Sequence, residues 1–221
     1  PDDGALAEAV RHVDWRALKL WKAATAPAAE SGADAATEAV PGFETEPEPK
    51  ACFAQLADPD AAVDAGGIAK GWIADALVAA MEAHGLSGTI VNLGGNVAVS
   101  GTKPTGDPWR VGIRDPRDPS QLIGAVPLVA GSAVTSGVYE RCFTAPDGTF
   151  YHHILDPRTG RPVETDVAGV TVICEKSIDA EGFSTTLLAL GLKRGLALAR
   201  RHPEILQAFF IAPDGTITNA R

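Results

Sequence analysis

Short apolar segments that follow one another with only turn residues between them constrain the fold of this chain most strongly. The sequence predicts a short strand from Val63, and further strands at 89–99, 109–114, 125–129, 133–136, 150–155, 167–174, 207–212 and 216–219. Helical spacing of apolar residues predicts helices at 5–26, 72–84 and 183–201. Strands neighbour one another more often than they alternate with helices. This order favours an α+β fold, with mixed or antiparallel sheets and packed helices, over a doubly wound sheet.

Composition excludes several classes of protein. Hydrophobic residues make up 45% of the 221 residues and charged residues 21%, which indicates a sizeable core and excludes a disordered chain. The net charge of −9 argues against a nucleic-acid partner, because phosphate recognition needs a clustered basic face. No apolar run approaches the ~20 residues that span a bilayer.

The three cysteines, Cys52, Cys142 and Cys174, are widely spaced and form no CxxC motif or Cys/His cluster. A zinc site is therefore not expected, and all three are predicted to be buried thiols.

Two glycine-rich blocks suggest close approach to a ligand. The segment DAGGIAKGWIAD, residues 64–75, places two glycines and Lys70 at the start of a helix, where backbone N–H groups and an ammonium can bind an anion. The alternative is a tight turn with a solvated lysine. The segment NLGGN has Gly94 and Gly95 in mid-strand, which indicates a bulge or the close approach of a ligand.

Two further blocks carry groups suited to proton transfer and to cation binding. In YHHILDPRTG, the residues His153, Asp156 and Thr159 fall at i, i+3 and i+6 of a turn beside Arg158. A structural histidine is the alternative, and strand alternation makes His152 the structural one of the pair. Farther on, Glu181 and Thr185 lie at i and i+4 of a helix, so their oxygens face one side and suit a hard cation. A carboxylate that complements the helix dipole is the alternative for Glu181.

In their order along the chain, these blocks resemble the ApbE family of flavin transferases. The resemblance rests on VDAGGIAKGWIADAL, VNLGGNVAVSG, TSGVYERCF, HHILDPRTGRPV and the helix after Glu181, and it covers about residues 55–215. It implies an ApbE-like (T-fold-like) α+β architecture with FAD in a cleft and Mg²⁺ on its pyrophosphate. A Thr or Ser hydroxyl of a target flavoprotein then attacks the FMN-side phosphorus, AMP leaves, and FMN stays on the target through a phosphoester link. The alternatives are an FAD pyrophosphatase that makes FMN and AMP, and a flavin-binding relative without turnover.

The resemblance also implies roles for residues. The metal ligands would be the backbone oxygen of Gly67, the Thr185 hydroxyl and Glu181, where the family usually has Asp; Asp179 is a substitute if the helix begins earlier. His153 would deprotonate the target hydroxyl, Asp156 would orient His153, and Thr159 would contact phosphate or target. The resemblance implies flavin or phosphate contacts from seven residues: Lys70, Asp75, Gly94, Gly95, Ser136, Gly137 and Arg158. For Asp75, an anchoring role in its loop is the favoured alternative.

Two expectations concern the chain's organisation and location. Residues 1–55 are interpreted as an N-terminal helix and irregular segment, and residues 56–221 as the catalytic domain. Family members usually carry a longer segment before the block at Asp64, so we expect a truncated N-terminus or a reduced form with an open pocket. The resemblance further implies an extracytoplasmic or periplasmic protein that meets a membrane only through its targets or a lost lipid anchor.

Overall fold

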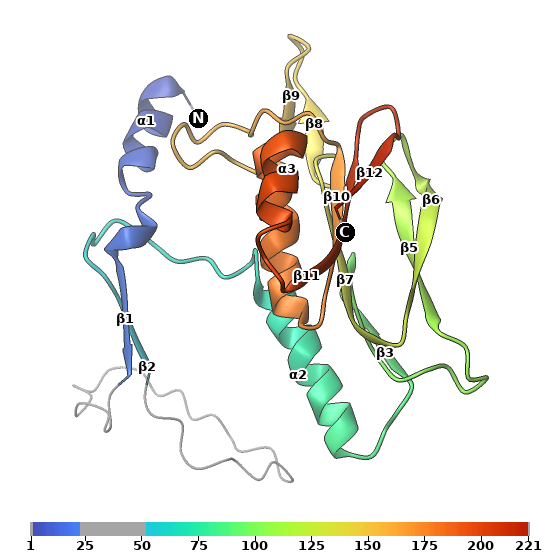
Figure 1. Ribbon diagram of the computed structural model, residues 1–221. Coiled ribbons are helices and arrows are strands. Elements are labelled where there is room, and N and C mark those ends of the chain that lie inside the picture. The colour runs from blue at the N-terminus through green and yellow to red at the C-terminus, as the bar shows by residue number, and fades with distance from the viewer. Residues whose placement is uncertain (1, 23–51, 221) are drawn as a thin grey trace. The chain divides into compact units, whose positions relative to one another are not determined.

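The computed structural model describes residues 2–22 and 52–220, and the chain divides into two compact units, Pro1–Val63 and Asp64–Arg221 (Figure 1). The division expected from the sequence, after residue 55, falls within the first unit. Each unit is described by itself.

The first unit differs from the single N-terminal helix that the sequence predicts. Its elements are α1 (Asp3–Arg11), a 3₁₀ turn η1 (Trp15–Ala17), β1 (Leu18–Lys22) and β2 (Cys52–Leu56). The helix ends early because Asp14 starts a new turn, with its carboxylate accepting a hydrogen bond from Arg16 N at 3.0 Å. The segment that follows pairs antiparallel with β2 along its whole length, so strand pairing replaces helix there. The predicted irregular connection at 27–50 lies outside the described residues.

The second unit is built on a six-stranded antiparallel sheet with the order β12-β11-β10-β7-β4-β3. Its strands are β3 (Thr89–Asn92), β4 (Asn96–Ser100), β7 (Ala130–Gly137), β10 (Gly169–Cys174), β11 (Ile205–Ile211) and β12 (Ile217–Ala220). The other elements are α2 (Ala69–Ala83), α3 (Ser177–Ala199) and two hairpins, β5 (Trp109–Asp115) with β6 (Asp118–Leu128) and β8 (Cys142–Thr144) with β9 (Phe150–His152). This arrangement confirms the α+β class.

Alternation along the central strands divides the core into two layers. Val134 and Val172 face α3, where they pack with Leu187. Ala133 and Ile173 point to the opposite face, which the hairpin β5–β6 covers with residues such as Val111 and Ile113. The two helices therefore lie on one face of the sheet and the hairpin on the other, as Figure 1 shows.

Several predicted elements need correction. The segment at Val63 forms no strand: residues 61–65 have no regular secondary structure, and a turn follows at 66–68. Gly94 and Gly95, with φ of 65° and 93°, reverse the chain between β3 and β4, so they form a turn and not a bulge within one strand. No strand was predicted at residues 142–144, but this segment forms β8, which the turn at Asp147 joins to β9.

The third helix and the cysteines also differ from expectation. Helix α3 begins at Ser177, earlier than predicted, and breaks at Gly191, where φ is 72°. Cys174 is buried as predicted, and burial raises the pKa of its thiol to about 12, but Cys52 and Cys142 are exposed. Both lie on short strands of two-stranded sheets that leave those positions open to solvent.

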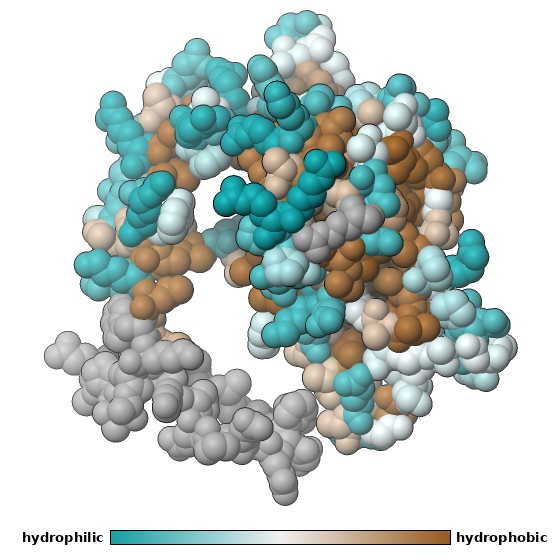
Figure 2. Space-filling model, viewed as in Figure 1, coloured by the Kyte–Doolittle hydropathy of each residue, from teal (hydrophilic) through white to brown (hydrophobic). Residues whose placement is uncertain are grey.

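The described surface mixes polar and apolar residues on the face shown in Figure 2. Among the described residues, no helix is long and apolar enough to cross a membrane.

Gly71 lets α2 and α3 approach each other closely. A Cβ at this position would lie 2.6 Å from Ile178 Cα and 2.7 Å from Ser177 O, both backbone atoms that cannot rotate away. We therefore expect Gly71→Ala to lower the free energy of unfolding by about 1–3 kcal/mol, even though alanine favours a helix. Urea denaturation measures this, with Gly182→Ala in α3 as the control, since a Cβ at Gly182 meets nothing within 4 Å. Equal stability of the two variants would contradict the close contact.

Candidate functional site

A buried carboxylate lies where α2, α3 and β4 meet. Glu181, in the second turn of α3, is 5% exposed. Its Oε1 is 3.0 Å from Lys70 Nζ on α2, and its Oε2 accepts a hydrogen bond from Asn96 Nδ2 on β4. A buried charge is costly unless it is paired and hydrogen-bonded, and here both oxygens have partners. Asp179 lies two residues away on α3, a helical rotation that turns its side chain to a different face, so it does not replace Glu181.

Asp75 fixes the start of α3 relative to α2. Its Oδ1 accepts a hydrogen bond from Ser177 N at 2.7 Å, and its Oδ2 accepts one from Ile178 N at 3.0 Å. Two otherwise unpaired N–H groups at a helix start are thereby satisfied by a neighbouring helix. The carboxylate is engaged by α3, which supports the anchoring role for Asp75 and argues against direct flavin contact.

Three hydroxyl groups join β7 to α3 next to Glu181. Ser136 Oγ lies 2.8 Å from Ser184 Oγ and 3.0 Å from Thr185 Oγ1. Thr185 is one helical turn beyond Glu181, so the structure brings together the predicted residues Ser136, Glu181 and Thr185. Gly137 follows Ser136 and is buried, and a Cβ there would lie 2.5 Å from the ring of Tyr139.

Gly67 lies in the turn that leads into α2, three residues before Lys70. Main-chain hydrogen bonds at this turn end on the carbonyl oxygens of Ala65 and Ile68, and in the described part of the chain none ends on Gly67 O. Carboxylate, hydroxyl and carbonyl oxygens are the donors that Mg²⁺ takes in proteins, so the set Glu181, Thr185 and Gly67 fits such an ion chemically.

The glycine pair Gly94–Gly95 lies in a different hollow. Thr135 and Ala133 line this hollow, whereas their neighbours Val134 and Ser136 face α3, so it opens on the other face of the sheet. Its lining also includes Arg110, Arg114, Tyr139 and Glu140. The structure therefore separates Gly94 and Gly95 from the hydroxyl groups around Glu181.

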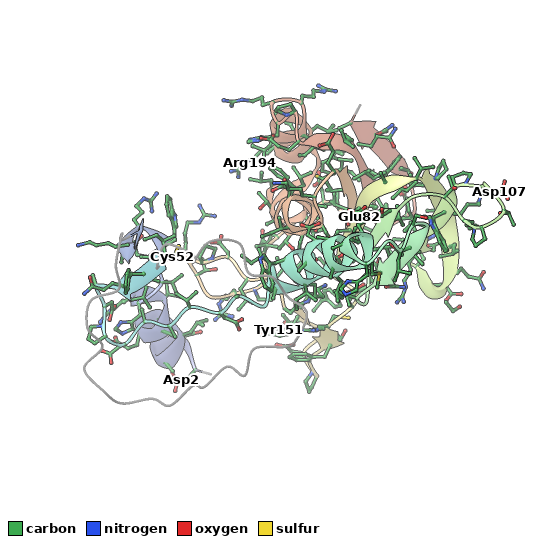
Figure 3. All side chains as sticks on the ribbon, turned by 90° about the horizontal axis from the view of Figure 1, so that it is seen from below. Asp2, Cys52, Glu82, Asp107, Tyr151 and Arg194 are labelled. Atoms are coloured by element: carbon green, nitrogen blue, oxygen red, sulfur yellow. The ribbon has the colours of Figure 1, made fainter. Side chains whose placement is uncertain are left out.

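His152 and His153 have different surroundings at the end of β9. His152 is buried, with Nε2 3.2 Å from Val163 O and Nδ1 accepting a hydrogen bond from Ile154 N at 3.3 Å. These partners require a neutral ring that carries its proton on Nε2. The expectation that His152 is structural is confirmed, while His153 is exposed. His152, the last residue of β9, lines a cleft between β9 and residues 161–165, as does Tyr151, which is labelled in Figure 3. His153 follows β9 directly.

The burial of His152 predicts a pH dependence of stability. Burial lowers the pKa of His152 in the folded chain below its usual value of about 6.5. The neutral ring therefore contributes its full stability above about pH 6.5, and this contribution is lost as the pH falls through the lowered folded-state pKa. We expect the free energy of unfolding to fall between pH 7.5 and 5.5, and to fall less in His152→Phe. Urea denaturation at the two pH values measures the difference, and an equal fall in both proteins would contradict it.

Asp156 does not orient His153, contrary to the prediction. Its carboxylate accepts hydrogen bonds from Arg158 N and Nε, at 2.9 and 3.0 Å, and from Nη2 at 2.6 Å. These bonds lower the pKa of Asp156 to about 2, so it stays ionised at neutral pH. The hydrogen bonds of Asp156 therefore stay within the DPRTG turn, because Arg158, two residues away, supplies donors to both carboxylate oxygens.

Two other predicted residues belong to the same turn. Arg158 was expected to contact flavin or phosphate. Although 85% of its side chain is exposed, its guanidinium is paired with Asp156. Thr159 is exposed and its hydroxyl accepts a hydrogen bond from Arg161 N at 3.3 Å.

Comparison with known proteins shows the family. A model of the ApbE family matches residues 1–210, and the chain belongs to this family. It is 43% identical over 170 residues to the FAD:protein FMN transferase of Treponema pallidum, which covers 72% of this chain and 46% of that protein. Identity to a FAD:protein FMN transferase of Klebsiella pneumoniae is 38% over 167 residues, covering 75% of this chain and 50% of the relative. The chain thus spans about half the length of the curated relatives that it matches.

Solved structures agree on the fold. The ApbE protein of Thermotoga maritima superposes with a TM-score of 0.75 at 27% identity, covering 100% of this chain and 62% of that one. The flavin transferase ApbE from Vibrio cholerae gives 0.70 at 26% identity, with 99% and 60% covered. The ApbE-like architecture expected from the motifs is confirmed.

Sequence reasoning missed four polar residues that the structure places at the Glu181 site and at the hollow beside Gly95. Asn96 and Ser177 are fully buried and join the Glu181 site, with Ser132 behind them. Glu140 lines the hollow at Gly95. Asn96 stood in the NLGGN block and Glu140 in TSGVYER, so a search for polar residues beside the glycines would have raised both as candidates.

Proposed function

We propose that this chain transfers FMN from FAD to a Thr or Ser hydroxyl of a target flavoprotein, with Mg²⁺, and releases AMP. The observation that carries this proposal is the buried carboxylate of Glu181, around which three of the family-like blocks meet. The relatives of this chain that are named FAD:protein FMN transferase support the same activity.

The residues that would hold Mg²⁺ are Glu181, Thr185 and the carbonyl group of Gly67. The ion supplies charge neutralisation on a diphosphate, where positioning and electrostatic stabilisation account for most of the catalysis. Lys70 adds a positive charge at the same place: its ammonium is 3.0 Å from Glu181, and its side chain is 41% exposed and so can reach a bound phosphate. Glu181 is one methylene longer than the Asp that is usual in the family. Its carboxylate nevertheless contacts both Lys70 on α2 and Asn96 on β4.

His153 is the group proposed to take the proton of the target hydroxyl. It is exposed directly after β9, where a polypeptide segment can approach it. The hydroxyl oxygen bonds to the FMN-side phosphorus as His153 accepts its proton, and the bond from that phosphorus to the bridging oxygen breaks. AMP leaves with that oxygen and its electron pair. Thr159, near the same turn, is proposed to contact the phosphate or the target.

The family resemblance also supports a location outside the cytoplasm, where the membrane-bound or exported flavoproteins that the family modifies are found. We propose an extracytoplasmic, periplasmic role that reaches the membrane only through the targets or a lipid anchor.

The release of AMP tests this function against its alternatives. The chain is incubated with FAD and Mg²⁺, with and without a flavoprotein that carries an acceptor Thr, and AMP is quantified by chromatography. A flavin transferase releases AMP in proportion to the acceptor. Equal release without acceptor would indicate an FAD pyrophosphatase, and FAD binding without AMP release under any divalent ion would indicate a binding protein.

A further inference from the structure

We infer that Asn96 is a positioning residue, which fixes the Glu181 carboxylate in the orientation that receives the metal ion. This inference rests on the proposed function, since it assigns a role in the same site. Asn96 lies on β4, 85 residues before Glu181, and is 0% exposed.

Hydrogen bonds determine which way the Asn96 amide points. Its Nδ2 donates to Glu181 Oε2, and its Oδ1 accepts from Ser177 Oγ at 2.7 Å. A flipped amide would place its oxygen against the carboxylate, where neither group has a proton to donate. The acceptor-only carboxylate therefore fixes the amide orientation, and the Ser177 hydroxyl donates to the oxygen end.

Behind Asn96, the bonded chain continues into rigid parts of the fold. Ser177 Oγ lies 3.0 Å from Ser132 Oγ, which is also 2.9 Å from Val97 O. Ser177 is itself held at the start of α3, because its N–H donates to Asp75. The side chains of Asn96, Ser177 and Ser132 are all fully buried, so water does not compete for their hydrogen bonds.

The two partners of Glu181 differ in a way that assigns the positioning role to Asn96. Lys70 reaches Oε1 from a partly exposed, flexible side chain and offsets the carboxylate charge. Asn96 reaches Oε2 from a buried strand and is neutral, so it orders the carboxylate without removing its attraction for a cation. A glutamate has one more torsion to fix than an aspartate, and a rigid donor on Oε2 fixes it. Partners of this kind typically change metal affinity by 10–100-fold when they are removed.

Metal affinity measured without FAD or turnover tests the role. Mn²⁺ is the probe, because the electron paramagnetic resonance signal of the free ion reports binding directly. The full chain is compared with Asn96→Ala, which removes the donor to Glu181, and with Ser132→Ala as the matched control. Ser132→Ala removes a buried polar group from the same bonded chain but leaves the Asn96–Glu181 bond in place.

We expect Asn96→Ala to bind Mn²⁺ about 10–100-fold more weakly, and Ser132→Ala to stay close to the unaltered chain. Should Asn96→Ala fail to fold, Ser177→Ala replaces it, since loss of the hydroxyl that orients the amide predicts a smaller weakening in the same direction. Unchanged affinity in the Asn96 or Ser177 variant, or an equal loss in Ser132→Ala, overturns the positioning role and leaves the proposed function standing. A wild-type chain that binds no Mn²⁺ overturns the metal site of the proposed function, and the positioning role with it.

Discussion

We expect His153→Ala to slow the proposed FMN transfer by about 10²–10⁴-fold, the usual contribution of a positioned general base. The expected loss follows because His153 is exposed directly after β9, whereas both ring nitrogens of His152 are engaged by Val163 and Ile154. FAD binding should change little, because the variant removes a proton acceptor and no proposed flavin contact. The rate is measured by mass spectrometry of a target flavoprotein at saturating FAD and Mg²⁺.

His152→Gln is the matched control for this variant. It alters the buried ring that holds Val163 O and should reduce stability while retaining most of the transfer rate at a temperature where the chain is folded. A His153→Ala variant that transfers FMN at the unaltered rate contradicts the base assignment, as does a His152→Gln variant that loses activity while staying folded.

We expect Glu181→Gln to lower the rate of the proposed transfer by about 10²–10³-fold and to raise the Mg²⁺ concentration needed for half-maximal rate. Glutamine has nearly the same shape but lacks the charge that attracts the ion, and a bound metal contributes several kcal/mol to such reactions, each ~1.4 kcal/mol being a factor of ten. The variant also leaves the Lys70 ammonium without its partner at 3.0 Å. Initial rates across a Mg²⁺ titration measure both effects.

Glu175→Gln controls for the loss of one negative charge, since Glu175 is exposed just before α3. It should leave the rate and the Mg²⁺ dependence unchanged. If Glu181→Gln retains the Mg²⁺ dependence of the unaltered chain, the ligand assignment is wrong.

Local sequence patterns predicted the parts of this fold that local rules govern. The apolar spacing after Lys70 predicted α2, and the strands predicted at 207–212 and 216–219 correspond to β11 and β12, which pair with each other. The spacing of Glu181 and Thr185 placed both on one side of α3, because positions i and i+4 are neighbours on any helix. The sequence and the family resemblance together therefore predicted that Glu181 and Thr185 belong to one polar site.

Features that depend on distant partners were not predictable in this way. The segment at Leu18 has apolar residues at helical spacing, yet it pairs as a strand with residues thirty or more positions away. The hydrogen bond of Asn96 to Glu181 and the capping of α3 by Asp75 likewise join residues far apart in the sequence. The role of Asp156 was misjudged for the opposite reason: its nearest donor, Arg158, is only two residues away and takes the whole carboxylate.

The intact mass of a target flavoprotein tests the central claim most directly. The chain is incubated with FAD, Mg²⁺ and the purified target, and the target is then weighed by mass spectrometry under denaturing conditions, with AMP quantified in parallel. FMN transfer predicts that the target gains the mass of one FMN and that AMP appears in equal amount, with both lost when the acceptor Thr is replaced. A target of unchanged mass, with or without AMP release, would contradict the account.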